Sequence, residues 1–479
     1  MVAGGGAALR NRWGMAAWLM PAAVALLLAG SYADSFLHPT FFGDQGLRLD
    51  HADELVFAAG PRVWLPFLQA HINVLYRLHV PAGAFLLIPY AYAVASLFLL
   101  ATLCRAAVSD PLTAFFATVT MLVAYCGASF QWLGRSLYQE SIVIPVFLAL
   151  VYLFYFAPQR RAAFIALLAV GMLTREVFWI WWLAFLTLNW RGRLRNPPLR
   201  AAAVALGAIP IVWLAWTSQS PLLSRNVVAL VEPVGGLGQR ISTLGALLVS
   251  ESLLPSLVML AAVFSIVLAK RGLRGLSYRG YHVFSLVSLG AIYGYVLLLD
   301  PWQATPENTR VLVPLYAHLL VWATLAWRDA SRLEGRVGFV ALVLCATGTL
   351  SLLKITAIVA VLGAAPPRTG AAWEPLRLPS RIEQREDWRD ALERALAPTR
   401  ESRGSRLEVA FIDIPRQEYL KFWVAAFLYE TRRPAGVGTS LPGADVVVAP
   451  ADTEIPSFAR RERLRLPGGI VRDVLVRER

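Results

Sequence analysis

Long apolar runs alternate with short polar stretches over the first 362 residues of the chain. A helix needs about 20 apolar residues to cross a hydrocarbon core about 30 Å thick, and the runs are of that order. They lie at residues 14–32, 83–103, 112–130, 140–157, 200–217, 253–269, 281–299, 310–326 and 337–362. This pattern predicts an α-helical polytopic membrane protein.

One further apolar stretch, residues 162–190, is interrupted in its middle by Thr174, Arg175 and Glu176. Each half would rise only about 20 Å at 1.5 Å per residue, so we expect two short helices that meet at a polar turn near one membrane face. The pair either crosses twice or forms a re-entrant hairpin. The chain then has about nine to eleven membrane segments.

The composition agrees with a membrane protein, because 57% of the residues are hydrophobic and only 16% are charged. Placing the N-terminus in the cytoplasm puts every strongly basic short loop on the cytoplasmic side, where Lys and Arg are normally enriched. The formal net charge of +14 therefore reflects topology, and no nucleic-acid partner is needed to explain it. We expect a multi-pass protein of a bacterial inner or plasma membrane.

The pattern changes after residue 362, where charged helical stretches alternate with short runs rich in β-branched residues. The runs 407–414, 444–450 and 469–476 are bounded by Pro or Gly or by charged residues and are typical of strands. We therefore predict two domains, a transmembrane domain over 1–362 with an outer loop at 33–82, and a small extracytoplasmic α/β domain over 363–479.

The outer loop carries an acidic cluster in the stretch RLDHADELVFAAG, residues 48–60. It contains Asp50, His51, Asp53 and Glu54. Each of these residues taken singly is equally typical of a solvated loop. Together they hold carboxylates at the boundary between water and lipid, where a reaction between a lipid-borne substrate and a water-side acceptor would need its base.

The order of these features resembles the GT-C superfamily of polytopic glycosyltransferases, which use polyprenyl-phosphate sugars. In that family the first outer loop carries an acidic D-E pair followed by W-x-P, matched here by Asp53 and Glu54 and then by Trp64, Leu65 and Pro66. Three later stretches are also similar, namely GRSLYQESIVIPVFLALVYL at 134–153, LTREVFWIWWLAFL at 173–186 and NTRVLVPLYAHLLVWATLAW at 308–327. The resemblance covers residues 14–330.

The resemblance implies a role for several of these residues. Asp53 would be the catalytic base, with Asp50 as the rival candidate, and Arg175 and Arg310 would bind the donor phosphate. Supporting roles would fall to Glu54, His51 and Glu140. Two alternatives stay open: Arg175 could instead form an ion pair with Glu176 or Glu140, and Arg310 could be an interfacial anchor. His51 and Asp53 could also supply two of the ligands to a divalent cation such as Mg²⁺ or Mn²⁺.

The implied function is that of an inverting glycosyltransferase of the cell envelope. It would move a sugar from a polyprenyl-phosphate donor to a hydroxyl of a glycan, lipid or protein acceptor. A flippase or transporter of lipid-linked sugars would also show intramembrane charges and broken helices, but the chain shows no pair of hydropathically similar halves. A non-catalytic membrane assembly protein that docks through its outer domain is the third alternative.

Overall fold

The computed structural model describes most of the helical part of the chain and most of the C-terminal strands. The described residues are 19–33, 36, 48, 65–190, 194, 196–217, 236–298, 309–353, 394, 407–412, 435–437, 441–466 and 470–477. They fall into two compact units. The first contains residues 19–33, 65–68 and 89–353, and the second contains residues 69–88 together with the C-terminal strands.

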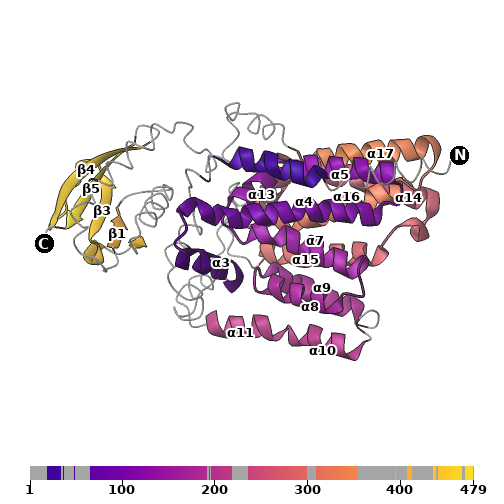
Figure 1. Ribbon diagram of the computed structural model, residues 1–479, viewed down its shortest axis with the longest axis horizontal. Coiled ribbons are helices and arrows are strands. Elements are labelled where there is room, and N and C mark those ends of the chain that lie inside the picture. The colour runs from indigo at the N-terminus through magenta and orange to yellow at the C-terminus, as the bar shows by residue number, and fades with distance from the viewer. Residues whose placement is uncertain are drawn as a thin grey trace. The chain divides into compact units, whose positions relative to one another are not determined.

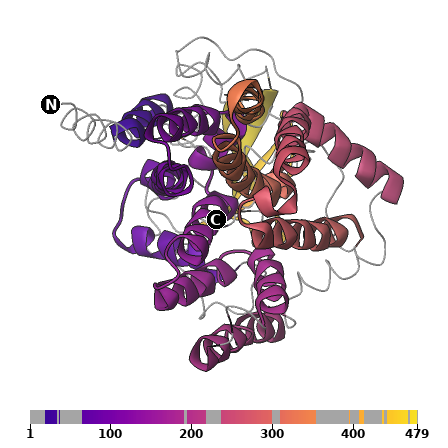
Figure 2. The ribbon, with the colours of Figure 1, turned by 90° about the vertical axis from the view of Figure 1, so that its right-hand side faces the viewer.

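The first unit is a bundle of helices (Figures 1 and 2). Every predicted apolar run coincides with one or two of them. The helices are Leu19–Ala33, α4 (Leu87–Ala107), α5 (Pro111–Tyr125), α6 (Ala128–Arg135), α7 (Glu140–Tyr155), α8 (Arg161–Met172), α9 (Val177–Asn189), α10 (Pro197–Ala205), α11 (Ala208–Thr217), α13 (Leu237–Ser250), α14 (Leu253–Arg271), α15 (Arg279–Leu298), α16 (Val313–Ala330) and α17 (Gly335–Leu350), with the short 3-10 helices η3 (Leu273–Gly275) and η4 (Thr309–Leu312).

Five of the described helices are long and apolar enough to cross a membrane, and five shorter apolar helices accompany them. The span Arg310–Ala330 is 78% buried, whereas the other four spans are at most 50% buried. Because the other spans expose more of their residues, α16 is the span that lies deepest in the bundle. The chain is a polytopic membrane protein, as its apolar pattern predicts.

The stretch 162–190 forms the two short helices α8 and α9, as predicted. Their turn lies beside the first residue of α7, because Arg175 forms an ion pair with Glu140. Helix α8 follows the C-terminal end of α7, and its own C-terminal end lies beside the first residue of α7. It is therefore antiparallel to α7, and α9 runs in the reverse direction to α8. Gly171 permits this tight hairpin, because a Cβ at that position would lie 2.5 Å from the ring of Phe178.

One predicted span is wrong in detail, since the run 112–130 does not form a single helix. In the structure α5 ends at Tyr125 and α6 begins at Ala128. The cause is a contact distant in sequence, because a Cβ on Gly127 would lie only 2.6 Å from the carbonyl oxygen of Leu352. The backbone of Gly127 therefore approaches the C-terminal end of α17, and the helix changes direction there.

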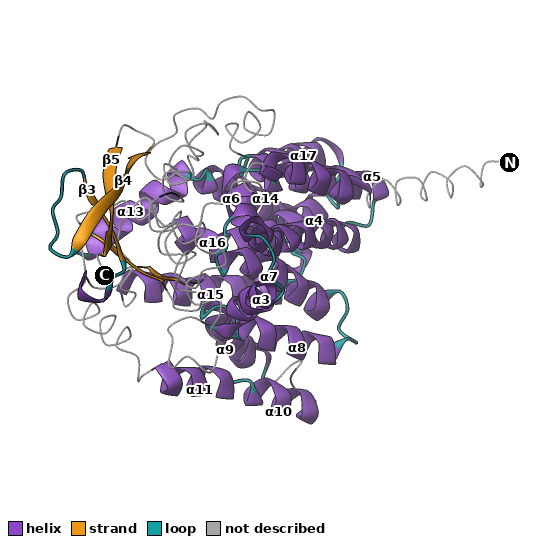
Figure 3. Cartoon of the chain, turned by 60° about the vertical axis from the view of Figure 1, so that its left-hand side comes forward, coloured by secondary structure: helices purple, strands orange, loops and turns teal. Residues whose placement is uncertain are grey.

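The second unit contains a small mixed sheet, which confirms the predicted C-terminal α/β domain in its strands (Figure 3). The strands are β1 (Leu407–Phe411), β2 (Ala435–Val437), β3 (Val446–Pro450), β4 (Phe458–Leu466) and β5 (Ile470–Arg477), in the order β2-β1-β3-β5-β4. Strand β1 is parallel to β2 and β3, and β5 is antiparallel to β3 and β4. The predicted domain boundary at residue 363 lies outside the described residues.

Strands β1, β3 and β5 coincide with the three predicted strands, but the sequence did not predict β2 and β4. Strand β4 reads FARRERLRL, and its arginines hide the alternation that a half-buried strand normally shows. The same unit also contains α3 (Pro66–Arg77) from Gln69 onward and the 3-10 helix η1 (Ala82–Leu86).

Candidate functional site

The segment 138–140, between α6 and α7, contacts side chains or backbone from several other parts of the bundle. Glu140 and Gln139 contact Arg175, Tyr138 contacts Arg310, and Gln139 contacts the backbone of Leu65. Residues 65, 139, 175 and 310 are far apart in sequence. The fold therefore gathers the three described candidate residues, Glu140, Arg175 and Arg310, around one short segment.

Arg175 forms two ion pairs at this segment. Its guanidinium lies 3.1 Å from the carboxylate of Glu140 and 3.1 Å from that of Glu176. The Glu140 side chain is 5% exposed, whereas that of Glu176 is 43% exposed. Both ion pairs that were alternatives to phosphate binding are thus formed.

The position of Glu140 follows from local helix physics. It is the first residue of α7, where a carboxylate interacts favourably with the positive end of the helix dipole. A buried carboxylate also needs a cationic partner, and Arg175 provides it. Glu140 therefore fixes the turn between α8 and α9 against the start of α7.

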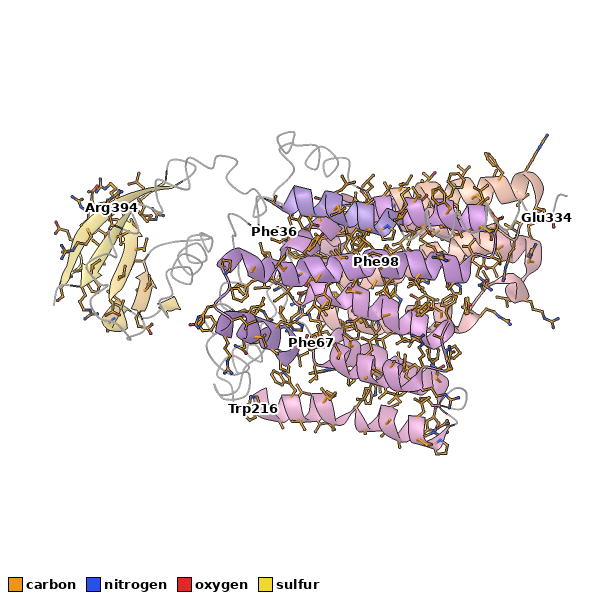
Figure 4. All side chains as sticks on the ribbon, in the orientation of Figure 1. Phe36, Phe67, Phe98, Trp216, Glu334 and Arg394 are labelled. Carbon is orange, nitrogen blue, oxygen red and sulfur yellow. The ribbon has the colours of Figure 1, made fainter. Side chains whose placement is uncertain are left out.

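Gln139 connects this turn to the chain that follows the first outer loop. Its side chain is buried, its Oε1 accepts a hydrogen bond from Nη1 of Arg175 at 3.4 Å, and its Nε2 donates to the carbonyl of Leu65 at 3.4 Å. A second bond reinforces the connection, since the amide of Phe67 donates to the carbonyl of Leu173 at 3.1 Å. Figure 4 shows Phe67 toward one end of the bundle and Glu334 at the other.

Arg310 lies in η4, directly before α16. Its guanidinium carbon is 5.7 Å from the ring centroid of Tyr138, which is within the range of a cation–π contact. The ring of Tyr138 in turn lies 5.5 Å from that of Trp132 on α6. Tyr138 therefore contacts both Trp132 and Arg310.

The residues of the predicted acidic cluster, Asp50, His51, Asp53 and Glu54, lie outside the described residues, as does Trp64. Leu65 and Pro66 are described, and Leu65 is fully buried and fixed by Gln139. The chain that follows the acidic loop is thus attached to the 138–140 segment. The roles assigned to the four cluster residues stay predictions.

The parts of the chain that the structure describes contain no group of three or more His, Cys, Asp or Glu side chains that could hold a metal ion. The predicted divalent-cation ligands, His51 and Asp53, are not among those parts. Metal binding therefore stays a prediction.

Sequence reasoning missed Tyr138 and Gln139, although both lie in the stretch singled out as GRSLYQES. The available signal was the order of three residues: the aromatic Tyr138 and the amide Gln139 come directly before Glu140, the acid that begins α7. The role of Gln139 depends on Arg175 and Leu65, which lie 36 and 74 positions away in the sequence. No local sequence pattern contains both Gln139 and these partners.

The fold of the chain is similar to that of proteins of known structure. No family model and no curated protein sequence matches the chain. Two crystal structures of ArnT from Cupriavidus metallidurans are similar. The structure bound to undecaprenyl phosphate has 13% sequence identity and a TM-score of 0.55, over 95% of this chain and 97% of that chain. The apo structure has 14% identity and a TM-score of 0.55, over 96% and 98%. The chain therefore has, over nearly its whole length, the fold of these two ArnT structures.

Proposed function

We propose that the protein is an integral-membrane glycosyltransferase that moves a sugar from a polyprenyl-phosphate donor to an acceptor hydroxyl. The strongest support is the match to the ArnT structure that contains undecaprenyl phosphate, which covers 95% of this chain and 97% of that chain. The arginines gathered at the 138–140 segment add local support, because guanidinium groups suit phosphate recognition.

The reaction needs few groups, because a polyprenyl phosphate is an activated leaving group. The acceptor oxygen attacks the anomeric carbon of the sugar, and the bond from that carbon to the phosphate oxygen breaks. Polyprenyl phosphate leaves with the electron pair, and the acceptor proton passes to a carboxylate. A single displacement of this kind inverts the anomeric configuration.

We assign the proton-accepting role to Asp53, with Asp50 as the alternative base. An aspartate with an ordinary pKa near 3.9 is ionised at neutral pH and can accept a proton. Glu54 and His51 would support this base. A divalent cation such as Mg²⁺ or Mn²⁺, held by His51 and Asp53, is compatible with the same arrangement, because imidazole and carboxylate are normal ligands.

Arg310 is the first candidate for the donor phosphate, because it lies over the Tyr138 ring at the 138–140 segment and a guanidinium can bind a phosphate in a bidentate manner. Arg175 is the second, and it would exchange one partner. A half-exposed ion pair such as that with Glu176 contributes only about 0–1 kcal/mol, so a phosphate could displace that carboxylate. The buried Glu140 would stay bound and hold Arg175 in position.

We further propose that the N-terminus is cytoplasmic and that the site and the C-terminal sheet face away from the cytoplasm. Support comes from two basic segments, 270–274 and 328–336. They begin in the last turns of α14 and α16, at the end of α16 opposite Arg310. Arg271 contacts the carbonyl of Arg332 there. Basic segments are typical of the cytoplasmic side.

The proposal is tested with purified protein in liposomes that contain a radiolabelled polyprenyl-phosphate sugar, to which a membrane extract is added as the source of acceptors. Release of free polyprenyl phosphate together with transfer of label to an acceptor supports the glycosyltransferase. Movement of the labelled lipid between leaflets without transfer would favour a flippase instead. Absence of both activities would favour an assembly protein.

A further inference from the structure

A buried polar cluster lies in the bundle apart from the 138–140 segment. Its members are Ser129 on α6, Glu251 between α13 and α14, and Tyr316 on α16. Glu251 is 1% exposed. The hydroxyl of Ser129 donates to the Glu251 carboxylate, and the Tyr316 hydroxyl lies 2.9 Å from both Ser129 Oγ and Glu251 Oε2. We call these three residues the Glu251 cluster.

The backbone beside Glu251 adopts an unusual conformation. Ser252 has a φ of +59°, in the left-handed region that residues other than glycine rarely adopt. This residue separates α13 from α14, so the first helix ends directly beside Glu251. Such a conformation persists only where the surrounding contacts hold it.

The Glu251 cluster is connected to Arg310 along two routes. On α6, Ser129 is followed one turn later by Trp132, whose ring contacts Tyr138, and Tyr138 lies beneath Arg310. On the other route, Tyr316 lies in the first turns of α16, directly after the 3-10 helix that carries Arg310. The cluster therefore joins the helix that positions Tyr138 to the helix that positions Arg310.

Stability alone does not account for a buried carboxylate at this place. Apolar residues that fill the same volume are often equally or more stabilising than buried charged groups. A directional polar cluster instead fixes how its helices are placed relative to one another. Here the helices concerned are α6 and α16.

We propose that Glu251, Ser129 and Tyr316 are positioning residues that hold Arg310 against Tyr138 for binding of the donor phosphate. This inference rests on the proposed function. In this proposal the three residues of the Glu251 cluster do not contact the donor. Its effect on donor binding passes entirely through Arg310.

The test measures the dissociation constant of undecaprenyl phosphate for the full-length protein and for variants with and without Arg310→Ala. Tyr316→Phe removes one hydroxyl and keeps the ring that contacts Phe130 at 5.1 Å, so its fold should survive. We expect Tyr316→Phe and Glu251→Gln to weaken binding by about 3- to 10-fold when Arg310 is present. Neither should weaken it further in the Arg310→Ala background.

Asp329→Asn is the matched control. Asp329 is also 1% exposed and accepts hydrogen bonds from Ser277, but it lies at the opposite end of α16, about 20 Å from Tyr316 along the helix at 1.5 Å per residue. Any effect of Asp329→Asn should combine additively with that of Arg310→Ala.

Two results would overturn the positioning role while leaving the proposed function intact. Either the cluster variants bind undecaprenyl phosphate as the wild type does, or they weaken binding by the same factor in both backgrounds. A wild-type protein that neither binds undecaprenyl phosphate nor transfers a sugar would instead overturn the proposed function, and the positioning role with it.

Discussion

Arg175 and Glu140 form an ion pair of 3.1 Å that joins the turn between α8 and α9 to the first residue of α7. Arg175 also pairs with Glu176, but the two carboxylates differ in their surroundings. Glu140 is buried, whereas Glu176 is half exposed and can be replaced by water or by another anion at little cost. One partner of Arg175 is therefore structural, and the other is exchangeable.

Replacement of each carboxylate by its amide should have opposite consequences. Glu140→Gln removes the buried partner, so the free energy of unfolding should fall by about 1–3 kcal/mol and donor affinity should fall with it. Glu176→Gln removes a competitor of the phosphate, so undecaprenyl phosphate should bind more tightly with unchanged stability. Thermal unfolding in detergent and equilibrium binding check both; weaker binding by Glu176→Gln would show that Glu176 does not compete.

Asp53→Asn should lower the rate of sugar transfer by about 100- to 10,000-fold, the usual contribution of a positioned general base. Donor binding should persist, because the variant keeps the size of the side chain. Asp50→Asn is the matched control and should have a smaller effect on turnover. If Asp50→Asn is inactive and Asp53→Asn is nearly normal, the base is Asp50; if both are active, the chemical assignment fails.

The proposed orientation predicts the location of the C-terminal sheet. A reporter enzyme that is active only outside the cytoplasm should be active when it is fused after residue 362. A fusion after Arg274 should be inactive, because that basic segment should face the cytoplasm. The reverse pattern of activity would overturn the orientation of the entire bundle.

The C-terminal sheet should lose stability in acid through Asp473. Burial alone would raise the pKa of this carboxyl, but hydrogen bonds from Arg463 at 2.8 Å and from the amide of Asp452 at 2.7 Å hold the pKa below its usual value. The unfolded chain therefore binds a proton at a higher pH than the folded sheet does. Stability is fully present above the ordinary aspartate pKa and falls as the pH drops from about 4 through the folded pKa.

Cleavage of β3 and β5 by pepsin, followed between pH 5 and 2 by mass spectrometry, measures this loss of stability. Asp473→Asn removes the titrating group and provides the reference for the pH dependence of the protease itself. Cleavage of the wild type should rise more steeply than that of the variant as the pH falls. Equal pH dependence would show that Asp473 does not control the acid stability of the sheet.

The sequence predicts the helices well, because length and hydrophobicity are local properties that a lipid environment enforces. It fails where a distant contact decides the backbone. Helix α5 ends before Cys126 and Gly127, where the carbonyl of Leu352 approaches Gly127. No local sequence pattern predicts this contact. Helix α13, LGQRISTLGALLVS, lies between the predicted spans 200–217 and 253–269 and was not predicted, because it is too polar and too short to be a span.

In the candidate site, too, the sequence predicts local features and does not predict contacts between distant segments. Charges such as Arg175 and Arg310 attract notice in sequence because they are costly near the bilayer. The importance of Gln139 and Tyr138 arises only when the fold brings them to Leu65, Arg175 and Arg310. Hydrogen bonds and ring contacts between distant segments are thus the part of the site that requires a structure.

The phosphate site at the 138–140 segment is tested most directly by the dissociation constant of undecaprenyl phosphate, measured for the wild type, Arg310→Ala and Arg175→Ala. Loss of a charged hydrogen-bonding group should weaken binding by about 10- to 100-fold in each variant. Arg310→Lys should recover only part of the affinity, because an ammonium group cannot bind phosphate in the bidentate manner of a guanidinium. Wild-type affinity in both alanine variants would contradict a phosphate site at the 138–140 segment.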